Sequence, residues 1–252
     1  MSNLKRIITT SIALAKAGFK EQNEGSYSGI ILQVIVPLLM LGVLVLIFSS
    51  AIGSQIPHYP FYILMGIVIF NFFTSTIANS IDIIKTNGQL AKNLKFPLIS
   101  LIISITFLNL FLHLPSIVII IIFILVTKSS ILGIIFYPLI LLFLTFFTLG
   151  ISFTLATMKV YHIDTSTIWS MLSLIWWFAT PIFYLVEKNS MIYQANLINP
   201  LFYIITTARE IIIYNRAPEP FIILGMLLFS LLSLLIGLFI FQKLENKFAE
   251  KL

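Results

Sequence analysis

Six apolar runs, each long enough to cross a lipid bilayer as a helix, leave few folds open to this sequence of 252 residues. A transmembrane helix needs about 20 consecutive, mostly apolar residues. The runs therefore predict an all-α membrane protein with six transmembrane helices in a single transmembrane domain. Two runs exceed the length of a straight crossing, so we expect tilt, and Pro115 favours a kink in the third. The runs cover residues 29–51, 60–81, 97–126, 131–158, 168–185 and 221–241.

The composition excludes several classes of protein. Hydrophobic residues make up 59% of the chain and charged residues only 10%, with a mean hydropathy of +1.07, whereas soluble domains carry about 25% charged residues. A water-soluble globule, a disordered chain, collagen and a nucleic-acid-binding domain are therefore excluded. Because the sequence contains no cysteine, disulfides, thiolate metal sites and cysteine nucleophiles are excluded as well.

The positions of the basic residues predict the orientation in the membrane. Cytoplasmic segments of membrane proteins carry an excess of Lys and Arg. With the N-terminus inside, eleven of the fifteen Lys and Arg residues fall on the cytoplasmic side, and the four on the external side are Lys128, Lys188, Arg209 and Arg216. Six crossings then place both termini in the cytoplasm.

Residues 1–27 predict an amphipathic helix that lies in the cytoplasmic interface of the membrane. Its basic residues fall away from one apolar face, as is typical of interfacial helices. A cleaved signal peptide is the alternative, with residues 15–17 as a cleavage-like site. We favour the interfacial helix because polar residues 9–11 interrupt the hydrophobic region that a signal peptide needs. The apolar face consists of Leu4, Ile7, Ile8, Ile12, Ala15 and Phe19.

A different element separates the fifth and sixth runs. Residues 186–220 contain two short apolar pieces, 191–198 and 201–214, on either side of Asn199-Pro200. Each piece is too short to span a bilayer, and irregular backbone at membrane depth must be buried in protein or line a cavity. We interpret the pieces as re-entrant or interfacial half-helices, with an ordinary amphipathic external loop as the alternative. The chain thus divides into 1–27, 28–185 with five spans, 186–220, and 221–252 with the sixth span and a cytoplasmic tail.

The sequence lacks the motifs of catalysis and metal binding. His58, His113 and His162 lie in three different segments without partners at metal-ligand spacing. The motifs G-x-S-x-G and G-x-x-x-x-G-K-[ST] are absent too. We therefore expect no catalytic residue, no metal site and no bound cofactor in this chain. For His113, inside the third run, a hydrogen bond to a neighbouring helix is the main interpretation.

Other classes of membrane transport protein are also disfavoured. Ion-coupled transporters usually bury acidic residues in their helices, but here Asp82 and Asp164 are the only acids near a run and both lie at cytoplasmic ends. A channel would need a filter motif or a ring of like charge, and neither is evident. The class that remains is a passive conduit, through which transport is driven by another component. One copy of six helices cannot enclose a wide pore, so self-association or a partner is implied.

Three stretches resemble the permeases of type-2 ABC exporters, in the branch that exports lipid-linked polysaccharides such as O-antigen, capsule or teichoic acid. The resemblance covers essentially the whole chain. In two places the sequence departs from the family pattern: Ile163 stands where the family has Arg, and Gln33 lies in the region where a tryptophan is common. The three stretches are NGQLAKNLKFP at 87–97, MKVYHID at 158–164 followed by TPIFY at 180–184, and Asn199-Pro200-Leu201 leading to Arg209.

The resemblance assigns roles to two sets of residues. It implies that residues 83–96 form a short amphipathic helix that docks in a cleft of an ATPase subunit, with the N-terminal helix as a second contact. A basic loop at the membrane surface is the alternative for 83–96, and a helix cap is the alternative for Asp164. The ATPase-coupling residues are then Lys85, Asn87, Leu90, Lys92, Leu94, Lys95, Phe96, Glu21, Glu24 and Asp164.

The second set forms the external gate. In this interpretation Arg209 holds the half-helices through Glu210, Glu187 or backbone carbonyls. The gate residues are Pro181, Tyr184, Asn199, Pro200, Arg209 and Glu210.

By the same resemblance, the chain is expected to be the permease subunit of an ATP-driven exporter in the bacterial cytoplasmic (inner) membrane. We expect a homodimer that contacts membrane lipid and binds two copies of a separate ATPase subunit, which uses ATP and Mg. The expected cargo is a lipid-linked glycan, moved from cytoplasm to exterior. This chain is then not itself an enzyme. A drug or lipid exporter of the same permease type, and a structural or assembly protein of the membrane, are the alternatives.

Overall fold

The computed structural model describes residues 2–23, 28–51, 53–93, 96–129, 131–188, 190–245 and 247–248, and these residues form helices and loops without a strand. The predicted all-α fold is confirmed. The elements, in chain order, are α1 (Ser2–Asn23), α2 (Ser28–Phe48), η1 (Gly53–Gln55), α3 (Tyr59–Ile81), α4 (Ile83–Asn93), α5 (Ile99–Thr127), η2 (Ile131–Phe136), α6 (Tyr137–Tyr161), α7 (Thr165–Ala179), α8 (Met191–Asn196), α9 (Pro200–Ile212) and α10 (Pro220–Glu245).

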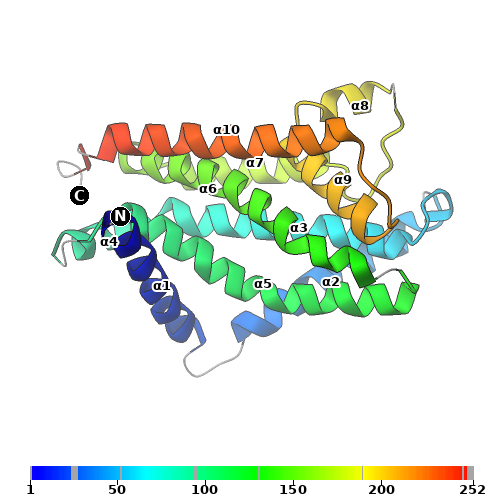
Figure 1. Ribbon diagram of the computed structural model, residues 1–252, viewed down its shortest axis with the longest axis horizontal. Coiled ribbons are helices and arrows are strands. Elements are labelled where there is room, and N and C mark those ends of the chain that lie inside the picture. Colours follow the sequence, from blue (N-terminus) through cyan, green and yellow to red (C-terminus); the bar gives the residue numbers. More distant parts are fainter. Residues whose placement is uncertain are drawn as a thin grey trace.

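The long helices form a bundle with two distinct ends (Figure 1). One end, called here the α4 end, holds α4, the start of α1 and the end of α10. The other, the α9 end, holds α8, α9, the loop before α3 and the end of α5. Successive long helices alternate in direction between these ends, and α5 changes direction along its length, with Pro115 inside it. A proline within a helix removes one backbone hydrogen bond and is a common cause of such bends.

The central helix of the bundle is α3. It contacts α2, α5, α6, α7 and α9. Of the residues in its apolar 18-residue stretch 78% are buried, compared with 11% in the corresponding stretch of α2. A helix that is apolar all round is expected to be buried. Near its middle the Phe73 ring stacks on Phe147 at 5.3 Å and meets Trp169 and Trp176 edge to face. The core therefore surrounds α3, while α2 presents apolar faces outward.

Five of the six predicted spans correspond to helices long and apolar enough to cross a membrane, within the part of the chain that the structure describes. These are α2, α3, α5, α10 and the segment from η2 through α6. The predicted hydrogen bond of His113 to a neighbouring helix is confirmed, because its Nε2 lies 2.7 Å from the Tyr137 hydroxyl of α6. The predicted span at 131–158 begins as a 3-10 helix before α6.

The fifth predicted span is wrong in its last third. The sequence predicts a helix over 168–185, but α7 ends at Ala179 after 15 residues, and residues 180–188 are non-helical. The physical reason is Pro181, which disfavours helical backbone at the residue before it. Thr180 accordingly has extended backbone, with φ −90° and ψ 135°. A crossing made by α7 together with the non-helical residues that follow it stays a prediction.

Two glycines permit close packing of α6 against α10. A Cβ atom placed on Gly237 would lie 2.1 Å from the carbonyl oxygen of Gly150, and one on Gly150 would lie 2.2 Å from the carbonyl carbon of Ser233. At the same contact, the Ser233 hydroxyl donates a hydrogen bond to the Phe147 carbonyl at 2.9 Å. Small residues at helix interfaces are a general means of close packing in membranes.

This contact predicts opposite effects for two Gly to Ala substitutions. Gly237→Ala places a methyl group against backbone that cannot rotate away, so we expect a loss of about 1–3 kcal/mol in the free energy of unfolding. Gly42→Ala, in α2, meets no atom within 4 Å and should gain up to about 1 kcal/mol from helix propensity. Unfolding by SDS titration measures both, and a Gly237→Ala protein as stable as Gly42→Ala would contradict the close packing.

Candidate functional site

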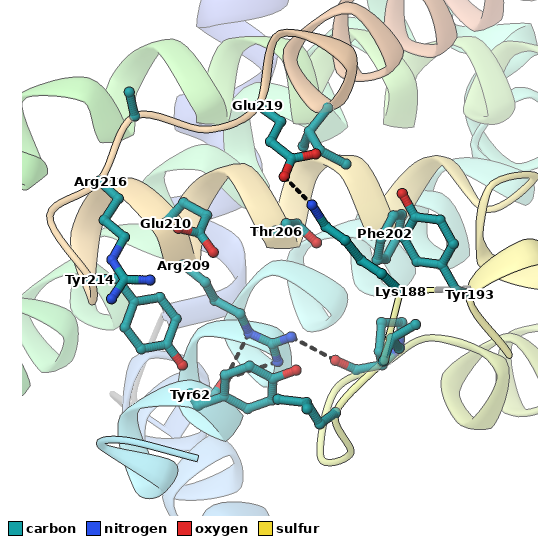
Figure 2. A pocket seen from close by; sticks show the side chains of 15 residues that line it. Tyr62, Lys188, Tyr193, Phe202, Thr206, Arg209, Glu210, Tyr214, Arg216 and Glu219 are labelled. Atoms are coloured by element: carbon teal, nitrogen blue, oxygen red, sulfur yellow. Dashed lines mark hydrogen bonds and ion pairs between the residues drawn. The ribbon is translucent and has the colours of Figure 1, made fainter. Parts of the chain in front are cut away.

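A buried guanidinium holds the α9 end together. Arg209 of α9 is only 3% exposed, and it donates four hydrogen bonds to three backbone carbonyls (Figure 2). Nε and Nη2 bind the Tyr62 carbonyl at 3.1 and 2.9 Å, Nη1 binds Pro181 at 2.7 Å, and Nη2 binds Ile182 at 2.8 Å. The guanidinium carbon lies 3.3 Å from the centroid of the Tyr62 ring. We call Tyr62, Pro181, Ile182 and Arg209 the Arg209 cluster.

The Arg209 cluster explains how non-helical backbone can follow α7. The carbonyls of residues 181–184 have no helical partners, and each accepts a bond from a side chain. Arg209 serves the first two, the Tyr59 hydroxyl donates to Phe183 at 2.9 Å, and the Tyr62 hydroxyl donates to Tyr184 at 3.0 Å. A buried carbonyl without a partner costs about 1–3 kcal/mol, so α3 and α9 together stabilise this segment.

Asn199 connects α9 to the end of α7. Its Oδ1 caps α9 by accepting from the Leu201 backbone N–H at 3.1 Å, and it also accepts from Trp176 Nε1 at 2.9 Å. Its Nδ2 donates to the Thr180 hydroxyl at 3.0 Å. Pro200 is the first residue of α9, a position where the missing N–H has no cost. The predicted break between two short helices is confirmed, because α8 ends at Asn196 and α9 begins at Pro200.

The predicted gate residues therefore lie close together, but Glu210 does not take part in the contacts among them. Pro181 and Asn199 are buried and Tyr184 is half-buried, with its hydroxyl donating to the Ala179 carbonyl at 3.0 Å. Arg209 uses backbone carbonyls, one of the partners that the sequence suggested. Glu210 differs: its backbone carbonyl accepts from the Arg216 N–H at 2.8 Å, but its carboxylate has no hydrogen bond or salt bridge to another described residue and faces a cavity (Figure 2).

This outer cavity has a volume of about 430 Å³ and lies between α9, the segment after α7 and the start of α10. Lys188 and Glu219 form a salt bridge at its rim (Figure 2). The hydrogen bond that Lys188 donates to Glu219, and then the charge of Glu219, raise the pKa of Lys188 above its usual value. Burial raises the pKa of Tyr214 to about 12, so its phenol stays protonated at neutral pH. The cavity lining comprises Tyr62, Pro181, Leu185, Val186, Lys188, Tyr193, Phe202, Thr206, Arg209, Glu210, Tyr214, Arg216, Ala217, Glu219 and Ile222.

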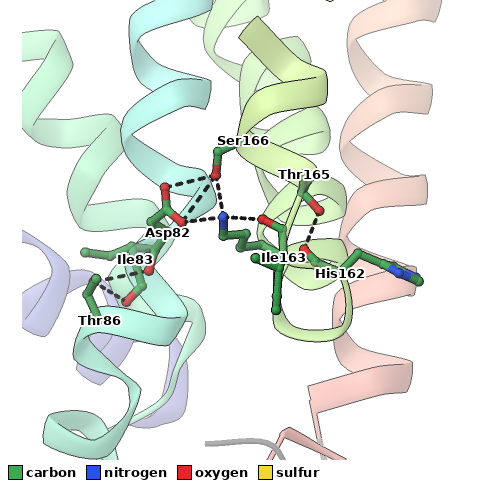
Figure 3. Close-up of polar contacts among 8 residues, drawn as sticks. Asp82, Ile83, Thr86, His162, Ile163, Thr165 and Ser166 are labelled. Carbon is green, nitrogen blue, oxygen red and sulfur yellow. Dashed lines mark hydrogen bonds and ion pairs between the residues drawn. The ribbon is translucent and has the colours of Figure 1, made fainter.

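At the α4 end, an ionic network joins three segments (Figure 3). Lys159 Nζ lies 3.1 Å from Asp82 Oδ1, and it donates to the Ser166 hydroxyl and the Ile163 carbonyl, both at 2.7 Å. The Ser166 hydroxyl in turn donates to Asp82 Oδ2 at 3.1 Å. The three donors of the ammonium group thus connect the end of α6, the loop before α7 and the residue between α3 and α4. We call Asp82, Lys159 and Ser166 the Asp82 network.

The Asp82 network extends into the proposed docking helix α4. The Asp82 carbonyl accepts bonds from the Thr86 backbone N–H at 3.0 Å and the Thr86 hydroxyl at 3.1 Å. On the same helix, Ile84 is fully buried in a small core with Phe153 of α6 and Phe241 of α10. A displacement of α4 would therefore act directly on α6 and, through Ser166, on α7.

The predicted ATPase-coupling residues on α4 and between α4 and α5 lie at the α4 end where the structure describes them, whereas Glu21 lies near the other end of α1. Lys85 is exposed and Asn87 half-buried on α4, which also carries Leu90 and Lys92, while Phe96 is half-buried before α5. Glu21 is exposed on α1. Leu94, Lys95 and Glu24 lie outside the described residues.

Asp164 does not act as the side-chain cap that the sequence offered as an alternative. It occupies the N-cap position of α7, but its side chain makes no capping hydrogen bond. Thr165 instead donates to the His162 carbonyl at 2.9 Å, and Ser166 belongs to the Asp82 network. Where the family pattern has Arg, the Ile163 side chain is 76% exposed and its carbonyl binds Lys159.

The predicted helix over 1–27 is present as α1, which packs against α5. Ala15 is buried beside Leu108 and Leu112, and the Ser11 hydroxyl donates to the Ser100 carbonyl at 3.2 Å. Leu4 and Ile8 of the predicted apolar face are 65% and 42% exposed. The location of α1 in a membrane interface stays a prediction.

Sequence reasoning missed the residues that connect these sites to the bundle. Tyr59 and Tyr62 supply hydroxyls to the segment after α7, and their spacing of three residues on one helix face was the available signal. Asp82 and Lys159 were visible only as charges at the ends of apolar runs. Among the described residues, no three His, Asp or Glu side chains are grouped so that they could bind a metal ion.

Comparison with known proteins identifies the family. Residues 10–213 match the family described as ABC-2 type transporter. The chain belongs to this family. Three curated relatives of this ABC-2 chain are each called O-antigen export system permease protein RfbA. The one from Myxococcus xanthus is 25% identical over 247 residues, which are 96% of this chain and 94% of the relative. Two from Klebsiella pneumoniae are 27% and 26% identical, and each alignment covers 98% of this chain and 96% of the relative.

The Arg209 cluster predicts that this ABC-2 chain depends on one guanidinium. Arg209→Ala leaves the buried carbonyls of Pro181 and Ile182 without donors and removes the second bond to the helical Tyr62 carbonyl, so we expect the free energy of unfolding to fall by at least about 2 kcal/mol. Arg209→Lys should restore little of it, because an ammonium group cannot reproduce the planar fork. Arg216→Ala, an exposed arginine four residues after α9, is the control and should change stability by less than about 0.5 kcal/mol. Equal losses at the two positions, measured by SDS titration, would contradict the role of Arg209.

The Asp82 network predicts energetic coupling between two charges. Asp82→Asn and Lys159→Met each break the network, so the double variant should lose less stability than the sum of the single variants. We expect a coupling of about 0.5–2 kcal/mol, because the Lys159 side chain is only 12% exposed, although the Asp82 side chain is 50% exposed. Unfolding of the four proteins of this cycle provides the measurement. Additive losses would mean that the ion pair contributes nothing.

Proposed function

We propose that this chain is the transmembrane permease subunit of an ATP-driven exporter that moves lipid-linked polysaccharide from the cytoplasm to the cell exterior. Membership of the ABC-2 family and the printed names of three relatives, all permeases of O-antigen export systems, support the proposal. No nucleic acid takes part. ATP and Mg belong to a separate ATPase subunit, and the permease provides the path.

The observation that carries the proposal is a groove in the side of the bundle, where six polar side chains lie on a mostly apolar surface. We call it the polar groove. Between α2, α3 and α7 lies a depression of about 380 Å³ lined by Gln33, Asn71, Thr74, Ser75, Ser170 and Ser173, together with apolar residues and Trp169. Polar side chains facing lipid tails are costly, and those in membrane proteins usually face a cavity or another helix. The four hydroxyls of the groove donate to carbonyls of their own helices. The amides of Gln33 and Asn71 are therefore the groups that favour a path for hydroxyl-rich cargo over a surface covered by lipid.

The two helices beside the groove support assembly as a homodimer. Only Thr165 and Trp169 of α7 are buried, and α2 is the least buried of the candidate spans in the described chain. Large apolar side chains on α7, such as Ile175 and Phe178, are 65% and 61% exposed. A second copy placed against α2 and α7 would cover these faces and close the open side of the groove, which one chain leaves open.

The α4 end suits the cytoplasmic side and an ATPase partner. Lys85 lies on α4, and Lys159 and Lys243 lie in the last turns of α6 and α10. The positive-inside rule places such cations in the cytoplasm. In our proposal, α4 and α1 contact the ATPase through the coupling residues, and the Asp82 network carries the displacement to α7. The orientation places the Arg209 cluster and the outer cavity on the external side of a bacterial plasma membrane.

Transport by vesicles that contain the chain and its ATPase subunit tests this function. ATP should drive a lipid-linked glycan across the vesicle membrane. Asn71→Leu combined with Thr74→Val removes two of the six polar side chains of the groove, and we expect the transport rate to fall about tenfold, equivalent to about 1.4 kcal/mol. The matched control is Thr154→Val on α6, because the Thr74 and Thr154 hydroxyls both bind the carbonyl four residues earlier at 3.0 Å. Transport of a drug or phospholipid but not of glycan would overturn the proposed cargo.

A further inference from the structure

The outer cavity contains groups that neither the fold nor the Arg209 cluster uses. Its volume of about 430 Å³ falls within the range of about 300–1,000 Å³ typical of pockets for small ligands. At about 30 Å³ per water molecule it holds the volume of about 14 waters. A hexose, with its twelve non-hydrogen atoms, fits a space of this size.

Aromatic side chains form much of the cavity wall (Figure 2). Tyr62, Tyr193, Phe202 and Tyr214 come from α3, α8, α9 and the residues after α9. Tyr193 and Phe202 meet edge to face at 5.9 Å, which fixes their relative orientation. The electron-rich face of an aromatic ring attracts weakly positive C–H groups. One face of a pyranose ring presents a set of such groups, so these walls suit a sugar better than a flat anion.

The charged groups around the cavity carry a net charge of +1, and those with hydrogen bonds to offer a ligand are equal in number for the two signs. Arg209 has its hydrogen bonds committed to backbone carbonyls. Of the remaining groups, Glu210 and Glu219 are negative and Lys188 and Arg216 are positive. A strongly charged ligand would leave one sign of charge unmatched in such a site. A neutral ligand with several hydroxyl groups can donate to the carboxylates and accept from the cations at the same time.

Two features make the site accessible and ready to bind. The carboxylate of Glu210 lines the cavity without a hydrogen bond or salt bridge to the described part of the chain. Lys188 and Glu219 pair across the rim with side chains 67% and 55% exposed, and exposed pairs of this kind contribute little stability. The pair can therefore open and close without disturbing the buried Arg209 cluster.

We propose that the outer cavity is a carbohydrate-binding site for a neutral sugar residue of the exported glycan, with Glu210 as the main hydrogen-bond acceptor and Tyr193 as a stacking platform. This inference rests on the proposed function and adds a place where the glycan is held as it leaves the path. Lys188 and Glu219 close the rim over the bound sugar.

Binding of free sugars to the full chain in lipid nanodiscs tests the site without ATP or a partner. The probes are methyl mannoside and methyl glucoside as neutral pyranosides, with glucuronate and glucosamine as charged comparisons, each at about 10 mM, where a ligand with a Kd of 1 mM would be near saturation. Saturation-transfer NMR should detect a neutral pyranoside, and Glu210→Gln and Tyr193→Ala should each reduce the signal at least about fivefold, the change in occupancy when Kd rises about fiftyfold. Glu187→Gln, an exposed acid that does not line the cavity, should leave it unchanged.

The possible outcomes separate this inference from the proposed function. Absence of saturation transfer from both pyranosides, a stronger signal from a charged sugar, or an unchanged signal in Glu210→Gln would each overturn the site. Unfolding curves that match the unaltered chain exclude misfolding of Glu210→Gln, which keeps the size of the side chain. If the site fails while vesicles still export glycan, the proposed function stands. If vesicles move no glycan, the proposed function fails whatever the sugar-binding result.

Discussion

The hydrogen bonds that Arg209 gives to backbone carbonyls are the interaction on which the α9 end depends. Where a helix ends inside a folded bundle, the carbonyls that follow have no helical partner and water cannot reach them. Each must therefore accept a hydrogen bond from another donor. Here Arg209, Tyr59 and Tyr62 supply donors to four successive carbonyls at 181–184. Because these donors come from α3 and α9, the end of α7 is tied to the central helix and to the short helices at once.

Helix α7 connects the Asp82 network to the Arg209 cluster. Its first turn is held through Ser166 by the Asp82 network, and its end is held by Asn199 and the Arg209 cluster. Along its length, however, only Thr165 and Trp169 are buried. A helix fixed at both ends and weakly packed at its sides can shift in response to force at either end. This places α7 between the proposed ATPase contact and the outer cavity, beside the polar groove.

Much of the fold was predictable because hydrophobic length is a local signal. Pro60, Pro97 and Pro220 mark sharp boundaries, and the corresponding helices begin within two residues of the predicted positions. The break at Asn199-Pro200 was predictable for the same reason, since Asn caps a helix and Pro starts one. The end of α7 was predicted too late: residues 180–185 are nearly as apolar as the helix before them, and only Pro181 distinguished them.

The contacts of the candidate sites were less predictable. Arg209 could be singled out as a charge in an apolar stretch, but the choice among acids and carbonyls depended on which backbone lay nearest after folding. Asp82 and Lys159 are separated by 77 positions in the sequence, and nothing local indicates that they pair. The outer cavity was equally hard to predict, because its lining residues are spread along the sequence from Tyr62 to Ile222.

The sequence by itself determined that this protein is helical, where most of its helices begin and end, and which family motifs it carries, because apolar length, prolines and short motifs act over neighbouring residues. Only the tertiary structure decided that Arg209 binds carbonyls of α3 and of the segment after α7, and that a salt bridge joins α6 to the start of α4. It also decided that polar side chains from three helices form one groove. These features depend on distances between remote segments, which packing of apolar helices around α3 sets.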